Sequence, residues 1–149
     1  MDILIRLHVF FLVILIAGCS ETELPSYWRC EGETSQVLLS DKGQELEKYS
    51  GPTSLLLESF RGTVTQYISV PFTGVYQTCI DNADSLTFSL GSCESLPVYR
   101  KGGLDKHSGK LLLSEIQLNS RGKIVNQGQF QCEYLGHVYP SDVFYGPKK

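Results

Sequence analysis

Apolar and polar residues alternate along most of the chain after residue 26, with the period of two that is typical of strands half buried in a core. The clearest run lies between residues 123 and 135. Its apolar side carries Ile124, Phe130, Cys132 and Tyr134, and its polar side carries Gln127, Gln129, Gln131 and Glu133. Gly128 falls on the apolar side and suggests a bend or bulge. The alternation predicts a long strand with Cys132 pointing into the core.

Shorter runs show the same alternation and indicate further strands. We expect them to bury Leu86, Phe88 and Leu90 in 85–90, Val64, Ile68 and Val70 in 63–70, Leu112, Ile116 and Leu118 in 110–118, and Trp28 and Cys30 in 27–30. Trp28 is expected to pack in the core against a disulfide. The runs 35–40 and 53–60 are also candidate strands, but their phase stays open.

Turn-forming residues separate these runs. Gly, Pro, Asn, Asp and Ser gather at 40–44, 49–54, 60–63, 80–85, 100–103, 106–110 and 119–123. Gly122 is expected in a left-handed conformation between two hairpin strands. Within 40–50 a short helix is an alternative, because Glu45 and Lys48 could share one helical turn. The short strands predict an all-β fold, an antiparallel barrel or a sandwich of about seven to eight strands.

The first residues form a different kind of segment. Arg6 precedes an unbroken apolar run from Val9 to Ala17, which ends in small residues. This arrangement is typical of an export signal that is cleaved. A membrane-spanning helix needs about 20 apolar residues, so a retained span is disfavoured.

The end of that run resembles the bacterial lipobox. Ile16, Ala17, Gly18 and Cys19 match its order of an aliphatic residue, two small residues and the invariant cysteine. The resemblance implies cleavage before Cys19 and lipidation of its sulfur, which holds the mature protein on a membrane. Ser20 follows the cysteine where aspartate would favour the inner membrane, so the resemblance implies an outer-membrane lipoprotein facing the periplasm.

These features divide the chain into three parts. We expect a lipoprotein signal peptide at 1–18, a lipid-anchored tether at 19–26, and a single all-β domain with an aromatic C-terminal arm at 27–149. Eight tether residues span at most about 28 Å when extended, so the domain is expected close to the bilayer.

The cysteine count agrees with an exported domain. Without Cys19 four cysteines remain, and an even number in an oxidising compartment predicts two disulfides. Three pairings are possible, and we favour Cys79 with Cys93 and Cys30 with Cys132, the second of which would join the first strand to the last. A zinc site is disfavoured, because no two cysteines have ligand spacing.

Composition and charge exclude several functions. The net charge of −3, with scattered Lys and Arg, lacks the basic stripe that nucleic-acid binding requires. The chain contains no nucleophile elbow and no phosphate-cradling loop. Its carboxylates fall on expected strand faces or in turns, so we expect no enzyme. No pattern implies a metal or organic cofactor or defines an oligomeric state.

Two segments are candidate binding sites. Residues 105–110 bring together His107, Ser108 and Lys110, although a plain β-turn is the favoured interpretation. The tail carries Tyr139, Phe144 and Tyr145, either as an ordered arm on the domain or as an exposed segment that binds a partner.

We therefore expect a non-catalytic binding or inhibitory module for a periplasmic protein or glycan. The plan of lipobox, all-β domain and structural cysteines loosely resembles the bacterial inhibitors of c-type lysozyme. Only the Ser-Gly pairs of 49–54 and 107–112 match the inhibitory stretch of that family, so no residue role carries over. The alternative is a structural or assembly lipoprotein of an envelope complex.

Overall fold

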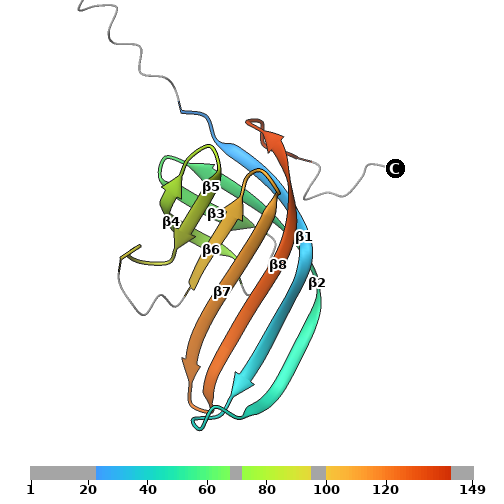
Figure 1. The fold of residues 1–149 in the computed structure, drawn as a ribbon, viewed down its shortest axis with the longest axis vertical. Coiled ribbons are helices and arrows are strands. Elements are labelled where there is room, and N and C mark those ends of the chain that lie inside the picture. Colours follow the sequence, from blue (N-terminus) through green and yellow to red (C-terminus); the bar gives the residue numbers. More distant parts are fainter. Residues whose placement is uncertain (1–22, 68–71, 95–99, 142–149) are drawn as a thin grey trace, which may run out of the picture.

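Eight antiparallel strands follow one another along the chain and close into a barrel (Figure 1). The structure, a computed structural model, describes residues 23–67, 72–94 and 100–141. Its strands are β1 (Ser26–Leu39), β2 (Glu45–Phe60), β3 (Thr63–Tyr67), β4 (Gly74–Asp81), β5 (Ser85–Ser89), β6 (Arg100–Asp105), β7 (Lys110–Asn119) and β8 (Gly122–Gly136). Each pairs with the next, and β8 pairs with β1. The all-β prediction is confirmed, and the fold is a barrel, not a sandwich.

The strands differ in length, and this gives the barrel two unlike ends. Strands β1, β2, β7 and β8 have 10 to 16 residues, whereas β3 to β6 have 5 to 8. The four long strands project past the others as a curved sheet (Figure 1). We call the end with turns 61–62, 82–84 and 106–109 the entry end, because β1 begins there. The end with turns 40–44 and 120–121 is the far end.

The core fills the barrel from the entry end toward its middle. It contains Trp28, Cys30, Leu55, Leu57, Val64, Phe72, Tyr76, Leu86, Phe88, Leu104, Leu111, Leu113, Phe130 and Cys132. Trp28, Leu86 and Phe88 are buried as predicted. Leu90 is half exposed instead, because β5 ends one residue earlier, at Ser89. Ile68 and Val70 lie outside the described residues.

Two disulfides fasten the barrel in the favoured pairing. Cys30 and Cys132 are register partners in β1 and β8, and their bond closes the sheet across 102 residues of sequence. Cys79 in β4 is bonded to Cys93, which follows β5. Loop closure in the unfolded chain makes each bond worth about 3 to 5 kcal/mol.

The predicted face of β7 is wrong. Leu111 and Leu113 point into the core, so Leu112 and Leu118 lie outside, with exposed fractions of 48% and 72%. The inner face continues with Glu115, whose carboxylate is buried and bonded to Arg100. Alternation misleads here because the outer face of this strand is the more apolar one.

Glu115 belongs to a polar chain that crosses the far half of the barrel. Asn126 donates to Glu115 (Nδ2–Oε2 3.0 Å), and Gln36 donates to Asn126 (Nε2–Oδ1 2.9 Å). The Arg100 guanidinium pairs with the other oxygen of the same carboxylate. Because a buried charge is tolerated only when it is paired and hydrogen-bonded, this chain lets the interior change from apolar to polar.

Glycines and turns account for other departures from expectation. Gly128 forms no bulge, since β8 keeps its register there. The absence of a side chain at Gly128 instead makes room for the rings of Phe130 and Phe72. A Cβ at Gly128 would lie 3.2 Å from Cε2 of Phe72 and closer still to the Phe130 ring. Gly122 has a φ of 136°, as the predicted hairpin requires. Residues 45–50 extend β2, so the helical alternative does not form.

Candidate binding groove

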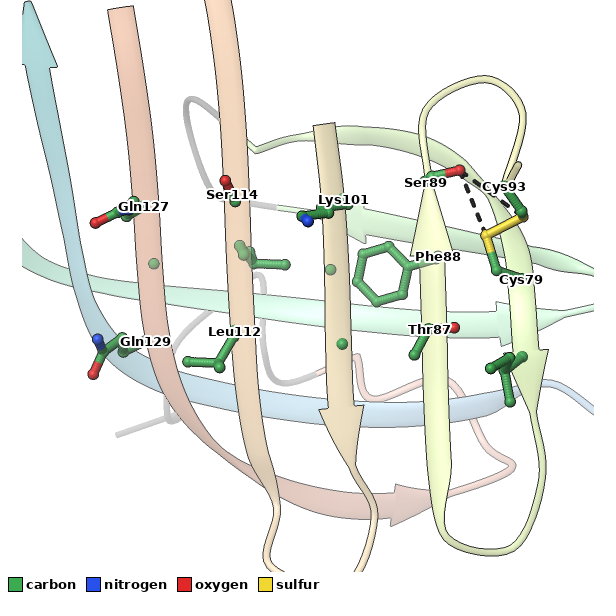
Figure 2. Close-up of a pocket in the computed structure, with 15 residues that line it drawn as sticks. Cys79, Thr87, Phe88, Ser89, Cys93, Lys101, Leu112, Ser114, Gln127 and Gln129 are labelled. Carbon is green, nitrogen blue, oxygen red and sulfur yellow. Dashed lines mark hydrogen bonds between the residues drawn. A yellow bond between two sulfur atoms is a disulfide. The ribbon is translucent and has the colours of Figure 1, made fainter. Parts of the chain in front are cut away.

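A groove of about 680 Å³ runs over the outer wall of the barrel, across β4 to β8. Figure 2 shows the residues that line it, with the Cys79–Cys93 disulfide on one side and Gln127 and Gln129 on the other. The lining residues are Cys79, Ile80, Thr87, Phe88, Ser89, Cys93, Lys101, Gly102, Gly103, Leu112, Leu113, Ser114, Gln127, Gly128 and Gln129. The groove thus gathers residues from five strands.

The strand register explains how this groove forms. One row of register partners crosses the wall as Ile80, Thr87, Gly103, Leu112 and Gln129. Side chains project from the wall at both ends of this row, while Gly103 in its middle has no side chain. At Gly103 the sheet therefore presents bare backbone to the groove.

The neighbouring Gly102 has a different structural role. Gly102 faces the interior, where a Cβ would lie 2.7 Å from Cδ2 of Leu113 and closer still to the ring of Phe88. A Cβ on Gly103 would meet only Cγ2 of Thr87, at 3.8 Å. Gly102 therefore permits core packing, and Gly103 keeps the groove open.

The disulfide forms one side of the groove. The pairing of β4 with β5 shifts between Thr78 and Ile80, which places Cys79 at an irregularity next to the groove. Its Sγ lies 3.5 Å from Oγ of Ser89, a side chain that is only 3% exposed. Ile80 stands beside the disulfide with 49% of its surface exposed. This side is apolar and covalently fixed.

The opposite side mixes an apolar centre with polar neighbours. Leu112 lies directly beside Gly103 in the register, and Gln129 follows it on β8. A second row places Lys101 next to Ser114 and Ser114 next to Gln127. None of the described residues that line the groove carries a carboxylate. The site offers aliphatic surface, hydrogen-bonding amides and a positive charge.

These groups are suited to binding, and they contain no recognisable catalytic set. Both cysteines are oxidised, so neither supplies a thiolate nucleophile. Ser89 has no histidine or carboxylate among the lining residues to act as its base.

A scan of family models and a search of curated proteins found no match to this chain. Among residues 23–67, 72–94 and 100–141, no group of three or more His, Cys, Asp or Glu side chains could hold a metal ion. The same ranges contain no helix long and apolar enough to cross a membrane.

The predicted residues of segment 105–110 lie at the entry end, away from the groove. The Asp105 carboxylate accepts hydrogen bonds from the backbone N–H groups of Ser108 (3.0 Å) and His107 (2.9 Å), and these bonds, that of Ser108 foremost, lower the pKa of Asp105. The exposed His107 ring lies 2.7 Å from Asp84. Lys110 donates its backbone N–H to Oγ of Ser108. The segment is a turn, as the favoured interpretation expects, and the backbone N–H of Cys132 holds it to β8 by donating to the carbonyl oxygen of Gly109.

The tail is described only as far as residue 141. Tyr139 packs edge-on against Tyr27, with ring centroids 5.6 Å apart. Tyr27 is only 6% exposed although it lies outside the core cluster, so the start of the tail covers the outer surface of β1. This agrees with an ordered arm up to Tyr139. Phe144, Tyr145 and Cys19 lie outside the described residues.

The groove itself was missed from the sequence. Its signal is the pair Gly102-Gly103, since adjacent glycines in a strand open space on both faces of a sheet. Assigning the pair to a turn concealed it, and so did the wrong phase of β7, which placed Leu112 inside. The disulfide prediction named Cys79 and Cys93 correctly but gave them only a structural role.

Proposed function

We propose that this protein is a lipid-anchored lipoprotein of the bacterial envelope, and that its barrel is a non-catalytic module that binds another protein through the outer groove. One observation carries the proposal. A closed barrel has no need to leave aliphatic surface in a concave site on its outer wall, yet Ile80 and Leu112 are each about half exposed there.

The lining favours a protein partner over a glycan. Sugar rings pack their C–H faces on exposed aromatic rings, and Phe88, the one aromatic among the described lining residues, is 1% exposed. An aliphatic side chain of a partner protein matches Ile80, Leu112 and the disulfide. Gln127 and Gln129 can hydrogen-bond its backbone, and an acidic neighbour would pair with Lys101.

The anchor rests on the lipobox match at Ile16 to Cys19 and on the disulfides, which suit an oxidising compartment. Outer-membrane placement facing the periplasm follows from the resemblance at Ser20. A tethered module meets partners at the same surface many times, so a modest affinity is sufficient. The alternative is a scaffold in an envelope complex, for which the captured partner would be a stoichiometric membrane component.

The groove is tested by filling it. Gly103→Val adds a branched side chain on the groove side of β6, where the Cβ meets only Cγ2 of Thr87 at 3.8 Å. Gly51→Val is the matched control, because Gly51 also lies in a strand and a Cβ there meets nothing within 4 Å. Each full-length variant is compared with the wild type in quantitative affinity capture from solubilised envelopes.

We expect one or more specific partners to be lost with Gly103→Val and kept with Gly51→Val. Equal capture by all three proteins would rule out the groove as the binding surface. If the wild type captures a partner in a stoichiometric amount, and that partner is part of a membrane complex, the scaffold role is favoured.

The anchor is tested separately with Cys19→Ser. We expect the wild type to incorporate a palmitate analogue and to fractionate with membranes, and the variant to do neither. Unchanged membrane fractionation without label would show that the lipobox is not used.

A further inference from the structure

An aromatic cluster surrounds the point where the chain enters the barrel. The Tyr134 ring packs on Trp28 with centroids 5.3 Å apart, and His137 stacks edge-on against Tyr134 at 6.0 Å. The His137 ring nitrogen Nδ1 lies 2.8 Å from the carbonyl oxygen of Pro25. The end of β8 and the start of β1 are thereby held together.

Exposed apolar side chains edge this cluster. The exposed fractions are 57% for Leu24, 50% for Tyr134, 80% for Val138 and 44% for Tyr139. We call these four residues the entry rim. An isolated exposed leucine or valine is ordinary, but here two aliphatic and two tyrosine side chains with exposed surface lie at the same end of the barrel.

The position of the rim relative to Cys19 suggests what covers it. Only four residues separate Cys19 from Leu24, and the five residue-to-residue steps between them reach about 18 Å at most when extended. A lipid on Cys19 would therefore keep the entry end within that distance of the bilayer. Tyrosine side chains with an apolar ring and a polar tip are the residues that favour a membrane–water interface.

The charges nearby argue against attraction to anionic lipid as the main force. Lys106 pairs with Asp81 (2.5 Å), and His107 lies beside Asp84. The Arg61 guanidinium lies over the Phe60 ring. Lys106 and Arg61 thus have partners within the protein, whereas the exposed Lys110 begins β7 and is not part of the rim. The rim itself offers apolar contact to the lipid.

We propose that the entry rim rests in the interface of the bilayer and holds the barrel upright, with the far end pointing away from the membrane. This inference depends on the lipid anchor proposed above. In this orientation the groove on the wall opens sideways, parallel to the membrane, and stays accessible to a partner. The turn of His107, Ser108 and Lys110 faces the membrane.

The single tryptophan provides the test, because Trp28 belongs to the aromatic cluster. Full-length lipidated protein is reconstituted into phosphatidylcholine vesicles that contain lipids with a nitroxide just below the headgroup. Nitroxides quench tryptophan only at short range. Val138→Glu introduces a charge into the rim, and Leu46→Glu introduces the same charge at an exposed position of β2 near the far end, where Leu46 is 52% exposed.

We expect strong quenching of Trp28 in the wild type and in Leu46→Glu, and a reduction by about half or more in Val138→Glu, since a charge in the interface is unfavourable. Co-sedimentation with vesicles is measured on the same samples. Co-sedimentation without quenching would overturn the rim contact and leave the anchor standing, and equal quenching in both variants would also overturn it. A wild type that does not sediment would refute the anchor and this orientation together.

Discussion

Two adjacent glycines of β6 should respond in opposite ways to the same small change. In Gly102→Ala the new methyl group enters the core, 2.7 Å from Leu113 and closer still to the Phe88 ring. In Gly103→Ala the methyl group enters the groove, with only Thr87 in contact at 3.8 Å. The pair therefore tests which face of β6 is inside and where the floor of the groove lies.

The magnitudes follow from packing. Forcing an extra carbon into a packed core costs about 1 to 3 kcal/mol. A domain of about 120 residues has an unfolding entropy near 0.25 kcal/mol/K, so each kcal/mol lowers Tm by about 4 °C. We expect Gly102→Ala to lower Tm by about 4 to 12 °C. Gly103→Ala should leave Tm unchanged or raise it slightly. Alanine loses less conformational entropy than glycine on folding, and the difference in free energy is about 0.5 to 1 kcal/mol.

The assay is thermal unfolding followed by circular dichroism, with both disulfides intact in every sample. Urea unfolding gives the free energy of each variant independently. If Gly103→Ala were the more damaging substitution, β6 would be turned over and the groove would not exist. Equal and small effects would mean that Phe88 and Leu113 do not crowd the backbone of Gly102.

Three further predictions concern stability. Gln66→Met should raise the free energy of unfolding by about 1 to 2 kcal/mol in urea titrations, because both polar atoms of the buried Gln66 amide lack a hydrogen-bond partner among the described residues; a loss of stability would contradict this. Replacing Cys79 and Cys93 together by serine should cost about 3 kcal/mol, the value for a loop of about 15 residues, and leave the circular dichroism spectrum of a barrel; loss of all strand signal would show that this bond is needed for folding. Burial raises the pKa of Tyr67 and of Tyr76 from 10.0 to about 12, so the stability that their protonated forms contribute is complete below pH 10 and is lost as the pH rises toward 12. Tyrosinate absorbance should show Tyr67 and Tyr76 titrating late, and titration of every tyrosine near pH 10 would refute this.

Much of the fold could be predicted because strand periodicity and cysteine parity report directly on what is buried. The alternation of Gln127, Gln129 and Gln131 with Phe130 and Cys132 fixes the phase of β8. Pairing of Cys30 with Cys132 follows once the first and last strands are taken as neighbours. The alternation could not distinguish a closed barrel from a sandwich, because strands of both folds show the same pattern.

Prediction failed where the barrel departs from an apolar interior. The inner face of β7 runs from Leu113 to Glu115, and only the contacts with Arg100 and Asn126 make that burial tolerable. Those contacts come from other strands and are invisible in the local pattern. The same error hid the groove, since an outward Leu112 is what makes the site apolar. A groove whose described lining is apolar and amide side chains with a single lysine leaves little trace in a sequence.

The central claim is that a partner protein occupies the outer groove of a lipid-anchored barrel. The most direct test places a photo-crosslinking amino acid at Gln129 in the full-length protein, in intact cells, with the same label at the exposed Lys48 of β2 as control. We predict a defined protein adduct from position 129 that disappears when Gly103→Val is added, and none of that size from position 48. An adduct that survives Gly103→Val, or the same adduct from both positions, would contradict the account.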